Sequence, residues 1–291
     1  MFTGSFVALV TPFRDGQVCE ETLRKLIEFH LEQGTHGIVP CGTTGESATL
    51  SHEEHEKVIS ITVEAVNKRV PVVAGTGSNS TEEAIRLTKH AKQAGADGAL
   101  LISPYYNKPT QEGIYQHFKR VAEEAKFPIV PYNVPGRTGS NVLPTTVARL
   151  AELPDVVAIK EASGSLQQVS DIIGLSGDKI AVLSGDDFIT FPMLAVGAKG
   201  AISVTANLAP ADVATMCDAY AAGDLKRAQE LHYKMRPLAE ACFLETNPIP
   251  AKSALAMMGM IPAEIRLPMT MISKANEPKL REALTAYGLL R

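Results

Sequence analysis

Near the middle of the chain stands the run Val156-Val157-Ala158-Ile159-Lys160-Glu161-Ala162-Ser163, bounded by Pro154-Asp155 and Gly164. A short apolar run that is rich in β-branched residues and flanked by glycine and proline favours a buried strand over a helix. Side chains alternate along a strand, so Lys160 shares a face with Ala158 and Ala162. We therefore predict a strand that carries one lysine between two small side chains near its end.

Two interpretations of Lys160 follow from this position. A desolvated lysine tends to lose its proton, and the neutral amine can then form an imine with a ketone or an aldehyde. In the alternative, the lysine stands at a strand end and its ammonium group reaches solvent. The stretch by itself leaves both interpretations open.

Seven further apolar runs resemble this one, and a segment with helical spacing follows each of them. They cover residues 6–10, 37–40, 71–74, 98–103, 128–133, 180–184 and 200–204. Strict alternation of strands and helices implies parallel strands joined by right-handed crossovers. Eight such units in about 220 residues predict a closed (β/α)8 TIM barrel, with an open doubly wound sheet as the alternative.

The rest of the chain has a different pattern. Residues 225–245, 251–258 and 278–290 have helical spacing, and no strand-like run lies between them. We therefore predict two parts, which are a catalytic barrel over residues 1–223 and a small helical C-terminal domain over residues 224–291.

Composition and charge argue against several classes of protein. The chain has 28 Lys+Arg and 32 Asp+Glu, a net charge of −4, whereas a nucleic-acid partner usually requires a basic face. We find no run of about 18 apolar residues and no basic signal-peptide region, so we expect no membrane association and a cytoplasmic location. The four cysteines lie far apart in the sequence, as is typical of reduced thiols in a cytosolic protein.

In barrels of this kind the chemistry lies at the carboxyl ends of the strands. The residues at the predicted strand ends provide hydroxyls, phenols, one lysine and one arginine, and they are Thr43, Thr44, Tyr105, Tyr106, Tyr132, Arg137, Lys160, Gly185 and Ile202. The set lacks the clustered histidine, aspartate and cysteine ligands of a metal site, so we expect neither a metal nor another cofactor.

Three features at these strand ends have two interpretations each. The turn Gly42-Thr43-Thr44-Gly45-Glu46 has backbone N–H groups that could hold an anion, or it is only a tight connection between strand and helix. Tyr132 is placed to transfer protons at an imine, or it packs in the barrel mouth. Arg137 suits a substrate carboxylate, or it forms a surface ion pair.

Three motifs together resemble the pyruvate-dependent class I lyases and, among them, the dihydrodipicolinate (4-hydroxy-tetrahydrodipicolinate) synthases. The motifs are Gly42-Thr43-Thr44-Gly45-Glu46, Tyr132-Asn133-Val134-Pro135 and Ile159-Lys160-Glu161. The similarity extends along the whole chain, and it includes Arg137, which the sialic acid lyases of the same superfamily generally lack.

The resemblance implies that the chain condenses pyruvate with L-aspartate 4-semialdehyde through a lysine Schiff base, in diaminopimelate and lysine biosynthesis. The alternatives are a sibling lyase that acts on another aldehyde and a ligand-binding barrel without catalytic activity.

The same resemblance implies a role for each site residue. Lys160 forms the imine, and Tyr132, Thr44 and Tyr106 relay protons, with Tyr106 donated by a neighbouring subunit of a homotetramer. The residues implied to bind or line the substrates are Thr43, Thr44, Arg137, Gly185, Ile202 and Asn247. An allosteric site for L-lysine is implied at Ser47, Ala48, His52, His55, Asn79, Glu83 and Tyr105. The alternative for this last set is a capped helix start with two exposed histidines, at which Ser51 and Glu54 form a capping box.

Overall fold

The computed structural model describes residues 2–290 and contains one main sheet. Its strands are β1 (Gly4–Ala8), β4 (Gly37–Val39), β5 (Val73–Gly75), β6 (Gly98–Ile102), β7 (Ile129–Asn133), β8 (Ala158–Glu161), β9 (Ala181–Ser184) and β10 (Gly200–Ser203). Their order in the sheet is β4-β1-β10-β9-β8-β7-β6-β5, and the registered pairs are parallel. Each strand overlaps one of the eight predicted runs, which confirms the prediction of a (β/α)8 barrel.

Helices alternate with these strands. They are α1 (Glu20–Glu32), α2 (His52–Val66), α3 (Thr81–Ala94), α4 (Gln111–Ala125), α5 (Pro135–Thr138), α6 (Pro144–Leu150), α7 (Leu166–Ser176), α8 (Thr190–Ala195), α9 (Pro210–Ala221), α10 (Leu225–Cys242), α11 (Ile249–Met257) and α12 (Glu277–Tyr287). The 3-10 turns are η1 (Ser47–Thr49), η2 (Gly177–Lys179) and η3 (Thr205–Asn207). The hairpin of β2 (Phe13–Arg14) and β3 (Gln17–Val18) was not predicted, because strands of two residues have no recognisable period.

The described chain divides into two compact units. The first unit contains the residues up to Gly4 together with Pro71–Ile202, and the second contains Ser5–Val70 and the residues from Ser203 onward. The helices α10, α11 and α12 fall within the predicted C-terminal domain. The predicted boundary between residues 223 and 224 stays a prediction.

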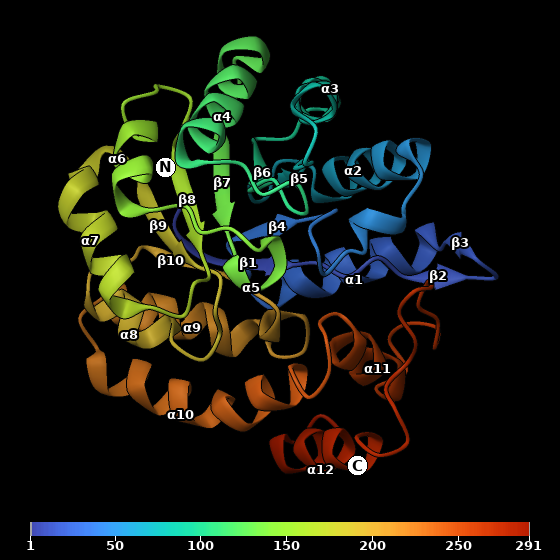
Figure 1. The fold of residues 1–291 in the computed structure, drawn as a ribbon. Coiled ribbons are helices and arrows are strands. Elements are labelled where there is room, and N and C mark those ends of the chain that lie inside the picture. Colours follow the sequence, from blue (N-terminus) through green and yellow to red (C-terminus); the bar gives the residue numbers. More distant parts are fainter. Residues whose placement is uncertain (1, 291) are drawn as a thin grey trace. The chain divides into compact units, whose positions relative to one another are not determined.

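In the first unit, the strands β5 to β9 lie side by side, and α3, α4, α6 and α7 pack in succession, each against the next (Figure 1). Every residue of β7 and of β8 is buried, as expected for parallel strands covered on both faces. In register, Tyr132 of β7 stands opposite Ile102 of β6 and Lys160 of β8. The sheet therefore brings a tyrosine and a lysine together at neighbouring strand ends.

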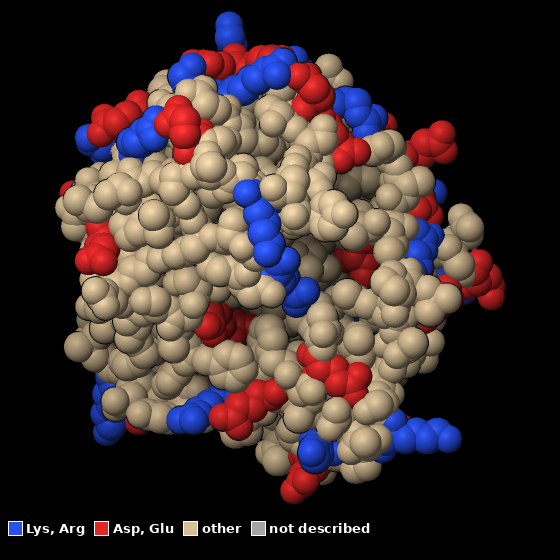
Figure 2. Space-filling model, viewed as in Figure 1, with Lys and Arg blue, Asp and Glu red and all other residues tan. Residues whose placement is uncertain are grey.

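Charged side chains on this unit are mixed in sign. Over α3 and α4, Figure 2 shows basic and acidic side chains side by side, and Arg120 pairs there with Glu82 at 2.6 Å and with Glu124 at 2.9 Å. Such exposed pairs add little to stability.

In the second unit, β1 pairs with β4, α1 packs against α2, and α10 packs against α9 and α12 (Figure 1). The N-terminus of α2 carries the predicted capping box, since Ser51 Oγ accepts from the Glu54 N–H and Glu54 Oε2 accepts from the Ser51 N–H. Across residues 2–290, no helix combines the length and the apolar character needed to cross a membrane.

Candidate active site

Lys160 of β8 is a buried lysine. Only 5% of its surface is exposed, and its Nζ lies 4.3 Å from the centroid of the Tyr132 ring. The interpretation of Lys160 as a strand-end lysine that reaches solvent is therefore wrong. The amine faces an aromatic ring instead of water, which is the environment that the first interpretation requires.

Burial lowers the pKa of Lys160 to about 8, with the Asp187 carboxylate acting against this shift and the Arg137 guanidinium adding to it. An amine with that pKa is about one-tenth neutral at pH 7, whereas an ordinary lysine is neutral only to about a few parts in ten thousand. Lys160 can therefore supply a nucleophilic amine near neutral pH. The effect of Asp187 on the pKa of Lys160 was not predicted from the sequence, although Asp187 lies shortly after the end of β9.

Gly185 provides the space that the lysine side chain occupies. A Cβ at this position would lie 2.8 Å from Lys160 Cε and 2.9 Å from Ala162 Cβ, closer than packed atoms approach. The predicted site residue Gly185 is thus in contact with the lysine, while Ile202 is buried in β10.

Tyr132 is the neighbour of Lys160 on β7. Burial raises the pKa of its phenol to about 12; Arg137 lowers that pKa, and Asp186 and Glu161 raise it. The phenol therefore stays protonated at neutral pH, so it can donate a proton to a group that develops negative charge beside Lys160.

Arg137 lies on α5, directly after β7, in a loop that is closed by its own hydrogen bonds. Thr138 Oγ1 donates to the backbone oxygens of Val134 at 3.3 Å and of Ser140 at 2.8 Å. The charge of Arg137 lowers the pKa of both Lys160 and Tyr132. Lys160 and Tyr132 are thus in contact in the first unit, and Arg137 follows β7 in the same unit.

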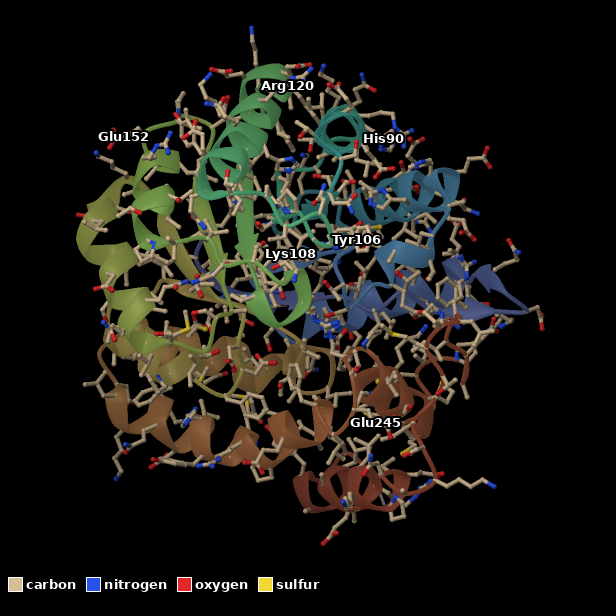
Figure 3. The ribbon with its side chains drawn as sticks, in the orientation of Figure 1. His90, Tyr106, Lys108, Arg120, Glu152 and Glu245 are labelled. Carbon is tan, nitrogen blue, oxygen red and sulfur yellow. The ribbon has the colours of Figure 1, made fainter. Side chains whose placement is uncertain are left out.

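Tyr106 has the opposite environment. It is 89% exposed, on the loop between β6 and α4 that also carries Lys108 (Figure 3). Its φ is 69°, and the Asn107 N–H donates to the Tyr105 backbone oxygen at 2.8 Å, which closes a tight turn around it. A tyrosine in the left-handed region is strained, so the loop holds Tyr106 outward at a conformational cost.

In the second unit, the predicted residues Thr44 and Asn247 meet. Asn247 Nδ2 donates to Thr44 Oγ1 at 2.9 Å, and both residues are buried. The turn that carries Thr43 and Thr44 is fixed by bonds from the Gly45 N–H to the Gly42 oxygen and from Thr11 Oγ1 to the Gly45 oxygen. These hydrogen bonds fix the backbone of the turn, and the backbone in turn sets the positions of Thr43 and Thr44.

A buried ion pair at the end of this turn was not predicted. Lys252 Nζ lies 2.5 Å from Glu46 Oε1, the Arg266 N–H donates to Glu46 Oε2 at 3.0 Å, and the Lys252 side chain is fully buried. The Nζ also lies 4.3 Å from the centroid of the Phe13 ring. Sequence reasoning offered no signal for this pair, because its members are 206 residues apart.

The predicted effector residues fall in both units. In the second unit, His52 is exposed but His55 is buried, so the alternative of two exposed histidines is wrong. In the first unit, Asn79 Nδ2 donates to the Tyr105 backbone oxygen at 3.2 Å, and Ser78 Oγ donates to Glu83 Oε2 at 2.5 Å. Within residues 2–290, no group of three His, Cys, Asp or Glu side chains is arranged to hold a metal ion.

Comparisons with known proteins give relatives of one family, and these matches cover nearly the full length of the chain. The model of the dihydrodipicolinate synthetase family matches residues 1–287. The 4-hydroxy-tetrahydrodipicolinate synthase of Syntrophobacter fumaroxidans is 62% identical over 291 residues, with both chains completely covered. A chloride-inhibited dihydrodipicolinate synthase from Acinetobacter baumannii, complexed with pyruvate, has a TM-score of 0.98 at 49% identity, with both chains fully covered. A dihydrodipicolinate synthase from Cyanidioschyzon merolae with lysine bound has a TM-score of 0.96 at 41% identity, with 99% of each chain covered.

Proposed function

The chain belongs to the dihydrodipicolinate synthetase family, and we propose how its residues carry out the family's reaction. The protein is an enzyme, a pyruvate-dependent lyase that condenses pyruvate with L-aspartate 4-semialdehyde to give 4-hydroxy-tetrahydrodipicolinate. The product belongs to diaminopimelate and lysine synthesis, and the cytoplasm is the proposed location. The observation that carries the proposal for the residues is the buried Lys160 amine against the Tyr132 ring.

The proposed mechanism begins at the Lys160 amine. Its neutral Nζ attacks C2 of pyruvate, and loss of water gives an imine whose positive nitrogen makes the methyl protons acidic. Loss of one such proton gives an enamine, and its carbon attacks the aldehyde carbon of L-aspartate 4-semialdehyde. The amino group of that substrate then attacks the imine carbon, closes the ring and displaces Lys160. Covalent catalysis divides one difficult bond formation into easier steps.

The other site residues serve these steps. We assign proton transfer to Tyr132 and Thr44, with Tyr106 of a neighbouring subunit as the third member of the relay. Thr43 and Thr44 bind pyruvate, while the remaining pocket residues Gly185, Ile202 and Asn247 shape the site. The Asn247–Thr44 hydrogen bond supports the pairing of these two residues in one site.

A substrate panel tests the activity directly. Purified protein with pyruvate is offered L-aspartate 4-semialdehyde, N-acetylmannosamine and glyceraldehyde in separate reactions, and the products are identified by mass spectrometry. We expect turnover of the semialdehyde to exceed that of the sugars by orders of magnitude. Preferred use of another aldehyde would instead identify a sibling lyase.

Arg137→Ala should impair use of the second substrate and spare the first. Losing a charge-assisted hydrogen bond costs on the order of 1.5–3 kcal/mol, so kcat/KM for the semialdehyde should fall about 10- to 150-fold. Borohydride trapping of the pyruvate imine, measured above about pH 8 where Lys160 is mostly neutral, should persist. Arg120→Ala on the exposed face of α4 is the matched control. Loss of trapping with normal use of the aldehyde would reverse the assignment of the two substrates.

Tyr106 is proposed to act in a partner's active site within a homotetramer. Its exposure and strained backbone support this, because a tyrosine held outward is available to a second subunit. Tyr106→Phe removes only the hydroxyl, so turnover should be lost while the oligomer stays intact in analytical ultracentrifugation. Mixing Tyr106→Phe with Lys160→Ala subunits should restore part of the activity. If verified subunit exchange restores none, each site is complete within one subunit.

L-lysine is proposed as an inhibitor that binds near Glu83, Asn79 and Tyr105. The bond from Asn79 to the Tyr105 backbone supports a coupling to the adjacent catalytic Tyr106. A coupling of about 1–3 kcal/mol changes affinity by about 5- to 150-fold. We expect heat of binding in titration calorimetry with L-lysine, and weaker binding to Glu83→Ala with normal imine trapping. An active enzyme that shows neither heat nor a thermal shift with L-lysine has no such site.

A further inference from the structure

The ends of β7 and β8 present two pairs of side chains in opposite directions. In register, Tyr132 stands opposite Lys160, and Asn133 stands opposite Glu161. Because side chains alternate along a strand, the second pair points to the other side of the sheet from the first. The first pair forms the candidate centre. The second pair takes no direct part in the reaction, although the Glu161 carboxylate raises the pKa of Tyr132.

Glu161 is a buried carboxylate, 1% exposed, that accepts from neutral donors. Its Oε2 accepts from Asn133 Nδ2 at 2.9 Å and from Gln168 Nε2 at 3.2 Å, and its Oε1 accepts from the Ser163 N–H at 2.7 Å. A carboxylate buried in this way depends on every one of its donors. Glu161 therefore fixes the positions of the groups that surround it.

Asn133 extends these bonds to the loop that carries Arg137. It is fully buried; its Nδ2 also donates to Asn141 Oδ1 at 2.8 Å, and its Oδ1 accepts from the Val142 N–H at 2.9 Å. Asn141 and Gln168 exchange two further bonds of 2.7 Å and 3.1 Å. Residues 134–140 therefore lie between two anchors, Asn133 before them and Asn141 with Val142 after them, and both anchors are tied to Glu161.

We propose that Glu161 and Asn133 are positioning residues that set the place of Arg137 relative to Lys160. One strand end then carries both functions: Lys160 holds the first substrate, and its neighbour Glu161 holds the loop that orients the second. The proposal rests on the proposed function, because it takes Lys160 as the imine former and Arg137 as the ligand of the semialdehyde carboxylate. Positioning of this kind matters because a displacement of about 1 Å can cost about 100-fold in rate.

Glu161→Gln tests the proposal with a side chain of almost the same shape. The amide that replaces the carboxylate has an NH2 group in place of one oxygen. This group faces either the side-chain donors of Asn133 and Gln168 or the N–H of Ser163, and two donors repel each other, so the loop must shift. We expect kcat/KM for the semialdehyde to fall about 10- to 100-fold, with the KM for pyruvate and the amount of borohydride-trapped imine within about twofold of wild type. Glu152→Gln, at an exposed ion pair with Lys179, is the matched control and should behave as wild type.

The double variant Asn133→Asp with Glu161→Gln is the rescue, because it exchanges the charged and the neutral member of the pair. The amide introduced on β8 can donate to the carboxylate introduced on β7, and that carboxylate can still accept from the Val142 N–H. The Asn141–Gln168 pair can rotate both amides together and keep its own two bonds. We expect the double variant to recover most of the loss of Glu161→Gln, which a requirement for bulk alone does not predict.

Three results would overturn the proposal: wild-type kinetics in Glu161→Gln, a proportional loss of imine trapping, or no recovery in the double variant. If Glu161→Gln does not fold, Gln168→Leu is the second test. It removes one of the three donors to Glu161 and the two bonds with Asn141 but keeps the bond from Asn133, so we expect a smaller loss confined to the semialdehyde. The absence of such a loss would also contradict the proposal. Failure of the proposed function itself is seen separately, because wild-type protein would then show no trapped imine or no use of the semialdehyde.

Discussion

Lys160→Ala should abolish the pyruvate adduct that borohydride traps in the wild-type enzyme. The residue supplies the nitrogen of the proposed imine, and no chemically similar group replaces it, so turnover should fall by at least about 1,000-fold. Mass spectrometry of the intact protein after treatment with pyruvate and borohydride measures the adduct, and peptide mapping places it. Lys199→Ala, an exposed lysine of the same unit, is the control and should be labelled normally.

The pH dependence of trapping adds a second test of Lys160. Burial lowers the pKa of its amine to about 8, and only the neutral amine attacks the ketone. The trapping rate should therefore rise with pH and level off above about pH 8, instead of rising towards the ordinary pKa of lysine. An adduct that persists in Lys160→Ala would remove this residue from the mechanism.

Lys252→Met should destabilise the second unit more than any surface substitution. The change leaves Glu46 buried with the Arg266 N–H but without its cation, and breaking one side of a buried pair costs about 3–5 kcal/mol. For a chain of this size, such a loss lowers the thermal midpoint by on the order of 10 °C. Differential scanning fluorimetry at fixed protein concentration measures the shift.

The double variant of this pair separates the charge from the packing. Glu46→Gln combined with Lys252→Met removes both charges and should recover much of the loss, because no unpaired charge then remains buried. Lys25→Met, at an exposed pair with Glu21 in the same unit, is the matched control and should shift the midpoint by only about a degree or two. If Lys252→Met were as stable as wild type, the buried Glu46 carboxylate would not need the Lys252 cation for its stability.

Local sequence signals were enough to locate the strands and the residues at their ends. Strand periodicity and flanking glycine or proline are local signals, so the eight runs were located, and the position of Lys160 between Ala158 and Ala162 followed from alternation alone. The capping box at Ser51 was predicted for the same reason, because both of its partners lie within three residues.

Whether the amine of Lys160 is buried or reaches solvent depended instead on packing against distant segments. Lys160 is buried because neighbouring strands and Tyr132 surround it, whereas the sequence of β8 allows an exposed amine equally well. The bonds of Glu161 to Asn133 and of Glu46 to Lys252 join residues 28 and 206 positions apart. Contacts at such separations depend on strand register and on the packing of distant segments, and no local period in the sequence encodes either of these.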